Sequence, residues 1–301
     1  MGLGPRMSKQ ELSEIAVGEA KDEMTDYTTY KRLATSEKSQ SNKDMFEKLS
    51  EMEHKHYDLW MKYRPQGAKI GPKKATVYFV LFLRRLFGAS FAIKFLEHRE
   101  MTTVKKYEAL KSSVPEEDQA AFQSMIEDEK GHETAFADIV AGTSIKYISF
   151  VVLGLADAVV EIAGIHAGSL GIYNSTELTG IAGIVAGAAA SLAMASAAFA
   201  QAKQGFEGKP GLAAAYTGGS YFVAAVVLAL PYFLTKQMLG AITLSLVFGL
   251  AMIAFVTWYN SISSGGRFLK DFSELAGVML GATFALYVFG NVIRLTFGIT
   301  I

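Results

Sequence analysis

The sequence contains no cysteine among its 301 residues. Disulfide bonds, thiolate metal sites and cysteine nucleophiles are therefore excluded. The chain also lacks a net charge, with 29 Lys and Arg against 29 Asp and Glu, so it has no basic excess for binding nucleic acid. It contains no glycine-rich phosphate-binding loop that would indicate ATP use. A polar stretch follows Arg6, and we expect no signal peptide there.

One short pattern occurs twice in the first half of the chain. It reads Glu-Met-Thr, then Tyr, then Phe, then Glu-x-x-His; the copies begin at Glu23 and Glu100 and end at His56 and His132. They are offset by 77 residues at the first glutamate and by 76 at the Glu-x-x-His, a difference of one loop residue. A repeat of this kind predicts a duplicated helical architecture.

The spacing of Glu-x-x-His has a chemical consequence. Residues i and i+3 lie on one helix face, so a glutamate oxygen and a histidine nitrogen can meet at one metal ion. A bundle that supplies a Glu from each of two helices and a Glu-x-x-His from each of two others forms the dinuclear carboxylate site of ferritin-like proteins. The alternative is a set of acidic surface helices without metal. We predict a di-iron site, with manganese or zinc as alternatives, whose ligands are Glu23, Glu53, His56, Glu100, Glu129 and His132.

The symmetry of the repeat predicts that Glu53 and Glu129 bridge the two ions. Three further glutamates lie near these ligands along their helices but have no counterpart in the repeat, and we rank them lower: Glu19, Glu97 and Glu127. Glu97 is the best of the three because it lies one helical turn before Glu100.

Apolar positions at three- and four-residue spacing predict four helices in this half. The first helix covers 8–38 and the second about 43–63. The third runs from near Gly88 to about Lys111, and the fourth starts near Pro115. The stretch at 141–144 is the predicted end of the domain.

The segment 75–96 allows two interpretations. Its length nearly spans a bilayer, but Arg84 and Arg85 lie in its middle, and each would cost about 2.5–3.5 kcal/mol there. It is either an apolar helix on the membrane surface or against the membrane half, bending near Gly88, or the long crossover of the bundle packed on its own core.

The charges are distributed unevenly, because residues 147–301 hold only six Lys and Arg and six Asp and Glu. Five apolar segments in that half approach or exceed the roughly 20 residues needed to span a bilayer. They cover 147–170, 178–202, 211–234, 240–262 and 272–298. We therefore predict an all-α protein, in which a ferritin-like four-helix bundle at 1–142 precedes a five-span membrane domain at 143–301.

The loop charges predict the orientation. With the bundle in the cytoplasm, Lys203, Lys209, Arg267 and Lys270 fall in inside loops, and Lys236 falls outside. That distribution obeys the positive-inside rule. We expect a multi-pass protein of the cell membrane with a cytoplasmic N-terminal domain.

Ionisable residues mark a function inside the first span. Asp157 and Glu161 are four residues apart on one helix face, and intramembrane acids typically line an ion path. The alternative is that both lie hydrated at the cytoplasmic end of the span. Met194 in the second span offers a thioether that helps select a transition metal, although a lone Met more often serves packing. His166 is on another face, which favours an interfacial position.

These residues resemble two known families. Residues 8–140 look like an erythrin-type ferritin-like domain similar to that of rubrerythrins, without the rubredoxin cysteines. Residues 147–301 resemble the vacuolar iron transporter family at Gly154-Leu155-x-Asp157, at Ala190 to Ala195 and at Leu230-Pro231-Tyr232. The fusion is similar to membrane-bound ferritins. The resemblance implies a dimer that exports Fe²⁺ in exchange for protons.

The chain departs from the transporter pattern in two places. Ala197 and Ala198 stand where that family usually has a Glu shortly after the Met, and 203–210 is too short for its long Glu-rich insert. The N-terminal bundle can stand in for that insert.

We expect a transporter of divalent metal, Fe²⁺ or Mn²⁺, that exports the ion from the cytoplasm by proton antiport and captures it in the bundle. A membrane-tethered di-iron ferroxidase or peroxide-reducing enzyme is one alternative, and a metal-sensing module that gates the membrane domain is another. Metal ions, protons, lipid and a second copy of the chain are the expected partners. Small residues at 180–202 agree with a homodimer because they allow close helix approach.

Overall fold

The structure is a computed structural model that describes residues 8–100, 103–140 and 143–298. The side chains of Glu100, Ser264 and residues 132–146 lie outside that description. All regular elements in the described residues are helices, which confirms the predicted all-α class. The chain divides into two compact units between Ile145 and Lys146, and the sequence places its boundary between 142 and 143.

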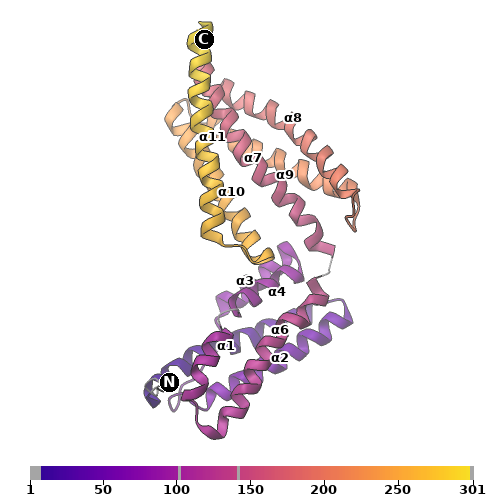
Figure 1. Ribbon diagram of the computed structural model, residues 1–301, viewed down its shortest axis with the longest axis vertical. Coiled ribbons are helices and arrows are strands. Elements are labelled where there is room, and N and C mark those ends of the chain that lie inside the picture. Colours follow the sequence, from indigo (N-terminus) through magenta and orange to yellow (C-terminus); the bar gives the residue numbers. More distant parts are fainter. Residues whose placement is uncertain (1–7, 101–102, 141–142, 299–301) are drawn as a thin grey trace, which may run out of the picture. The chain divides into compact units, whose positions relative to one another are not determined.

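The first unit is built mainly on two long neighbouring helices, α1 and α2 (Figure 1). Its helices are α1 (Lys9–Ser36), α2 (Gln40–Met61), α3 (Lys74–Phe87), α4 (Ala89–Glu100), α5 (Thr103–Leu110) and α6 (Gln119–Val140). A capping box starts α1, because the Ser8 hydroxyl accepts a hydrogen bond from the Glu11 amide and the Glu11 carboxylate accepts one from the Ser8 amide.

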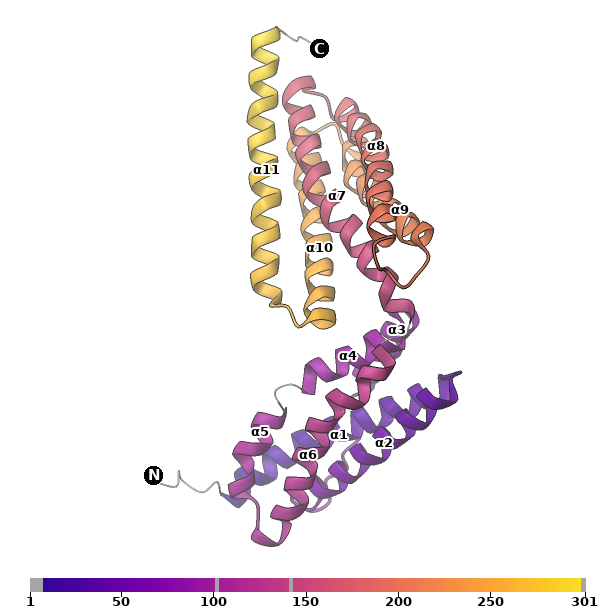
Figure 2. The ribbon, with the colours of Figure 1, turned by 45° about the vertical axis from the view of Figure 1, so that its right-hand side comes forward.

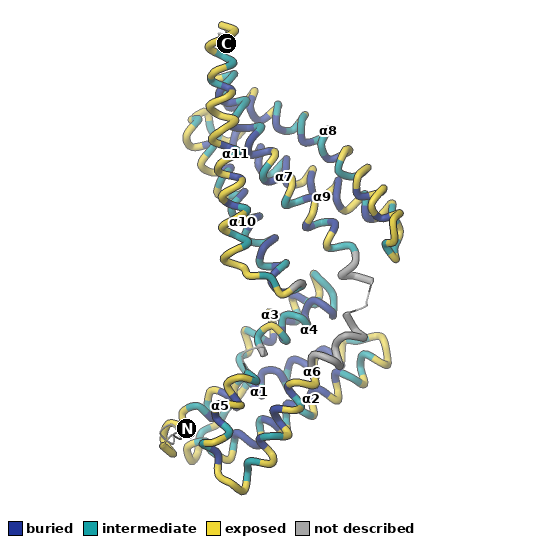
Figure 3. The backbone as a smooth tube through the Cα atoms, viewed as in Figure 1, coloured by how far each residue is buried: buried dark blue, intermediate teal, exposed yellow. Residues whose placement is uncertain are grey.

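Two apolar clusters occupy opposite ends of this unit. One surrounds Trp60 and includes Tyr107 and Phe122; the other surrounds Tyr30 and Phe46. Along α1 and α2 the buried polar residues fall between these clusters in the sequence, where the helices carry Glu23, Glu53 and His56. The buried strip of each helix is visible in Figure 3. The polar layer is therefore enclosed by apolar packing on both sides.

The segment 75–96 is divided at Gly88, as the sequence predicts. Gly88 has φ 88° and ψ 170°, a conformation that residues with a side chain avoid, and it separates α3 from α4. The inner face of α3 packs onto the bundle through Val77, Val80 and Leu83, each no more than 2% exposed. The segment thus contributes to the core of the first unit.

The second unit consists of five helices that are long and apolar enough to cross a membrane, within the described residues (Figure 2). These are α7 (Thr143–Tyr173), α8 (Thr176–Ala202), α9 (Pro210–Leu234), α10 (Met238–Ser264) and α11 (Phe268–Phe297). Their apolar stretches fall on the five predicted segments, which supports a membrane-embedded protein.

Glycine allows the membrane helices to approach closely. A Cβ on Gly290 of α11 would lie 2.2 Å from the backbone oxygen of Gly168 in α7. A Cβ on Gly187 of α8 would lie 2.5 Å from the Cβ of Ala225 in α9. Part of the small-residue face at 180–202 is therefore occupied within the chain, and those residues are not available to a second copy.

Replacing Gly88 with alanine tests the α3–α4 corner. We expect Gly88→Ala to lower the unfolding free energy of the first unit by about 1–3 kcal/mol, because an alanine is strained at this φ and ψ. Thermal unfolding of the full chain, followed through the fluorescence of Trp60 after Trp258→Phe, measures the change.

Gly18 supplies the matched control. It lies exposed within α1, and a Cβ there would meet nothing within 4 Å. Gly18→Ala should therefore stabilise the same unit by about 0.5–1 kcal/mol. Equal effects of the two substitutions would contradict the assigned corner.

Candidate metal centre

Four buried side chains from three helices converge in the first unit. Glu23 comes from α1, Glu53 and His56 from α2, and Glu129 from α6. One ligand atom from each lies within 4.8 Å of the others. The helical spacing explains the pair on α2, since Glu53 and His56 are one turn apart and both face the bundle interior. This cluster can hold a metal ion.

His56 lies at the centre of this cluster. Its Nδ1 is 3.3 Å from a carboxylate oxygen of Glu129, 3.4 Å from one of Glu53 and 3.8 Å from one of Glu23. The His56 side chain is only 3% exposed. A cation in this position would be shared by three carboxylates from three helices.

The electrostatics of the cluster follow from its burial. Burial lowers the pKa of His56, but Glu129, Glu23 and Glu53 raise it more, and the net pKa is well above its usual value. Burial raises the pKa of Glu23, but the contact with His56 lowers it, and the net pKa is lowered. An imidazolium thus balances buried carboxylates, and a metal ion that binds through Nδ1 must displace its proton.

Two aromatic side chains support Glu23 through consecutive hydrogen bonds. The hydroxyl of Tyr107 donates to the Glu23 carboxylate, and the indole Nε1–H of Trp60 donates to that hydroxyl over 3.3 Å. Burial, followed by the charge of Glu23, raises the pKa of Tyr107 well above its ordinary value, so the phenol remains a donor. Tyr107 therefore fixes the orientation of Glu23.

Asp128 contacts the other side of the His56 ring. Its carboxylate oxygen lies 3.4 Å from Nε2, the nitrogen that faces away from Glu53 and Glu129. A carboxylate at this position orients the imidazole and directs Nδ1 toward a metal ion. The sequence signal was present, because Asp128 directly precedes Glu129, but which ring it would reach depends on helix packing.

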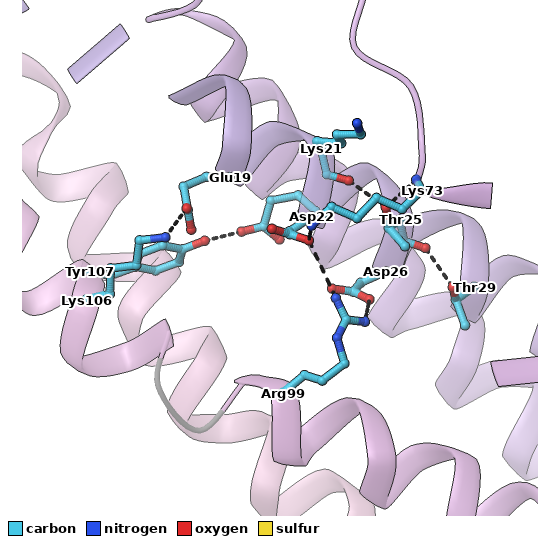
Figure 4. A network of polar contacts seen from close by, with 11 residues as sticks. Glu19, Lys21, Asp22, Thr25, Asp26, Thr29, Lys73, Arg99, Lys106 and Tyr107 are labelled. Carbon is cyan, nitrogen blue, oxygen red and sulfur yellow. Dashed lines mark hydrogen bonds and ion pairs between the residues drawn. The ribbon is translucent and has the colours of Figure 1, made fainter. Parts of the chain in front are cut away.

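A cavity of about 250 Å³ adjoins the cluster, and its lining includes Glu23, Glu53 and Glu129. Figure 4 shows charged residues around it, with Arg99 of α4 beside Asp22 and Asp26 of α1. The guanidinium of Arg99 lies 3.5 Å from Asp22 and 3.4 Å from Asp26. Two lysines complete the ring of ion pairs: Lys73 pairs with Asp22, and Lys106 pairs with Glu19. Ions can reach the buried carboxylates through this charged opening.

The remaining predicted ligands have different positions. The side chains of Glu100 and His132 lie outside the described residues. Glu19 lines the cavity and is paired with Lys106, and Glu97 is half-buried outside the four-residue group. Glu127 is exposed on α6, accepts a hydrogen bond from Gln123, and lies outside the four-residue group.

In the second unit, Asp157 and Glu161 are both exposed along α7. The hydroxyl of Tyr221, from α9, donates to Glu161 over 2.6 Å. Met194 is half-buried against the apolar cluster that contains Tyr221. Glu161 is thus bonded to a tyrosine of the same cluster on which Met194 packs.

His166 lies inside the packed helices of the second unit. Its side chain is fully buried, with the ring centroid 4.6 Å from that of Tyr232. A Cβ added to Gly183 would overlap the His166 ring, so the glycine makes room for it. This histidine fills the junction of α7, α8 and α9.

The donors of the first-unit cluster fit a divalent transition metal. Three carboxylates and one imidazole are ligands that suit iron, manganese and zinc, and no softer thiolate ligand is available in this chain. No protein-family model, curated protein or solved structure was found to match the chain. Its function must therefore follow from its own residues and sequence motifs.

Removing one carboxylate tests the centre. We expect Glu53→Ala to lower the metal content of the full chain by about one ion or more, because it removes a ligand that lies among the other three. Elemental analysis after exposure to Fe²⁺ or Mn²⁺ measures the loss. Glu51→Ala is the control, since Glu51 is exposed on the same helix; equal metal content in both variants would remove the assignment.

Asp128 should act through His56. We expect Asp128→Asn to weaken metal binding about tenfold without abolishing it, because the ring loses its charged orienting partner but no ligand is removed. Titration of the full chain with Mn²⁺ measures the affinity. Glu127→Gln changes the neighbouring exposed acid and should leave the affinity unchanged; a similar loss in both variants would show a general charge effect.

Proposed function

We propose that the chain exports a divalent metal ion, Fe²⁺ or Mn²⁺, from the cytoplasm by exchange with protons, and that its first unit captures the ion beforehand. The observation that carries the proposal is the combination of two acid groups in one chain. One is the buried Glu and His cluster, and the other is the pair Asp157 and Glu161 on an apolar membrane helix. A simple anchor needs neither five spans nor acids inside one of them.

The first unit is proposed to be a ferritin-like bundle that binds a pair of metal ions. Glu23, Glu53, His56 and Glu129 supply part of the ligand set, and the repeat supplies Glu100 and His132 as the remainder. The rim acids are balanced by their ion pairs with Arg99, Lys73 and Lys106, so the attraction for a cation comes from the buried carboxylates Glu23, Glu53 and Glu129 that also line the cavity.

The second unit is proposed to carry the ion. Asp157, Glu161 and Met194 offer hard oxygen and soft sulfur donors on two adjacent spans. Two nearby carboxylates repel in a low-dielectric medium, so an arriving cation and a departing proton are natural alternatives there. Such an exchange couples metal export to proton entry. The resemblance to vacuolar iron transporters and membrane-bound ferritins supports this assignment.

A homodimer is part of the proposal. Asp157 and Glu161 are exposed in the single chain, although a charged side chain facing lipid is costly. Intramembrane acids usually face protein or water, and a second copy that packs beside α7 would provide both around a central path. The exposed acids, rather than the small residues of α8, are the argument for the dimer.

A membrane-tethered ferroxidase is the second candidate. The cavity reaches Glu23, Glu53 and Glu129 directly, so a small oxidant has access to metal held there. Oxidation would yield Fe³⁺, and a transporter of Fe²⁺ would not gain from this product. The two functions are therefore distinguished by the membrane acids, because a tethered enzyme does not require them.

Proteoliposomes with a pH-sensitive dye inside test the proposal. We expect Fe²⁺ or Mn²⁺ to drive proton movement with the native chain, and we expect Asp157→Asn to abolish it because the exchangeable carboxylate is lost. The metal content of the first unit should not change in this variant. Glu177→Gln is the control, since Glu177 is an exposed acid in the first turn of α8.

Glu53→Ala provides the converse result. It should empty the first unit but leave transport at high metal concentration, where local capture no longer limits supply. Transport at the native rate by Asp157→Asn would reduce the second unit to an anchor, and the ferroxidase would then take the place of the transporter.

A further inference from the structure

The helix α3 has a second apolar face that points away from the bundle. Val77, Val80 and Leu83 form its buried inner face. On the outer face, the exposed fraction is 59% for Tyr78, 43% for Phe79, 53% for Phe82 and 55% for Leu86. We call these four residues the aromatic face of α3. Their spacing places them along one side of a helix of 14 residues. A soluble surface rarely exposes such a row of large apolar side chains.

The charged residues in the part of the sequence that contains the aromatic face have one sign. Residues 59–96 contain eight Lys and Arg and no Asp or Glu, in a chain whose net charge is zero. Two of these cations, Lys74 and Arg85, are exposed near the two ends of the face. A third cation comes from α1, because the Arg32 guanidinium lies over the Tyr78 ring at 5.0 Å from its centroid. The aromatic face is therefore bordered by positive charge.

The other cations of α3 are already engaged with the bundle. Arg84 donates to the carbonyl of Ser36 over 2.8 Å and lies 3.3 Å from Glu37, and Lys73, just before α3, pairs with Asp22. These contacts fix the rotation of α3 about its axis. The orientation of its outer face is thus set by the bundle, which keeps the aromatic face turned outward.

We propose that the aromatic face of α3 lies in the interface of an anionic membrane, with its rings among the upper acyl chains and Arg32, Lys74 and Arg85 on lipid phosphates. An amphipathic helix with aromatic residues on one face and flanking cations binds membranes in this manner. Tyrosine and arginine are suited to the boundary because each combines an apolar body with a polar tip.

The chain itself favours lipid as the occupant. The first unit ends at Ile145, and the first apolar span begins at Tyr147, so only one residue separates them in the sequence. A surface held at a membrane needs only weak individual contacts to stay there, because attachment makes the contact intramolecular. Anionic lipid phosphates match the positive charges beside the face, and acyl chains match its apolar rings.

The absence of native cysteine permits a direct test in the full chain. Phe82→Cys, labelled with an environment-sensitive fluorophore, is placed in lipid discs of phosphatidylcholine alone or mixed with phosphatidylglycerol. We expect a nitroxide attached to the lipid to quench the fluorophore, and we expect the quenching to increase at least twofold with the anionic lipid. Leu86→Cys should behave in the same way. Glu47→Cys, at an exposed position on α2, should be quenched by aqueous acrylamide instead.

Reversing the flanking charge separates lipid binding from other causes. Lys74→Glu with Arg85→Glu, combined with Phe82→Cys, should remove the increase caused by phosphatidylglycerol. If the quenching does not change with phosphatidylglycerol in either variant, Lys74 and Arg85 do not bind anionic lipid and the proposal is overturned. Access of acrylamide to position 82 would show a water-exposed face, and protection from both quenchers would show a face covered by protein; either result overturns the proposal. None of these outcomes depends on metal transport.

Discussion

The first unit depends on the balance of charge around one buried histidine. Three carboxylates from three helices meet in a buried layer between two apolar clusters, and unbalanced anions in such a place would be costly. The His56 imidazole lies within 4 Å of all three. Apolar clusters on both sides hold the helices together, and the charged layer determines how they are aligned. A divalent metal ion that replaces the proton of the histidine would add one positive charge and balance the carboxylates further.

The two halves of the repeat do not surround the centre equally. Asp128 approaches the Nε2 of His56, and the residue that corresponds to it in the first copy is Met52. A methionine cannot accept the strong hydrogen bond that a carboxylate accepts, so the first copy of the repeat carries no orienting acid at that position. In the proposed two-metal centre, this difference in sequence is expected to make the two positions differ in affinity.

Periodicity in the sequence predicted the helical class, the corner at Gly88 and the five apolar helices, because these depend on local residue order. The Glu-x-x-His spacing also identified Glu53, His56 and Glu129, since it depends only on helical geometry. The orienting and rim residues could not be predicted in this way. Neighbouring residues on a helix point about 100° apart, so Glu127 faces solvent while Asp128 reaches His56. That difference is set by the packing of α6 against α2.

The segment 75–96 shows why an apolar pattern can be ambiguous. The alternatives of a bundle crossover and a membrane-surface helix seemed exclusive because each requires an apolar face. In the structure, α3 buries Val77, Val80 and Leu83 while it exposes Tyr78, Phe79, Phe82 and Leu86. A helix that is apolar on both sides can pack one face on the bundle and keep the other face for a membrane surface.

The proposed capture and transport sites face opposite physical demands. A capture site gains from ligands that are fixed before the ion arrives, and the buried cluster has them: Tyr107 orients Glu23, and Asp128 orients His56. A transport site must release its ion, so ligands held less firmly are an advantage. Glu161 receives one hydrogen bond from Tyr221, and both it and Asp157 are exposed along α7. The proposed capture site thus has ligands held in place by neighbouring side chains, and the proposed transport site has exposed acids that can release the ion.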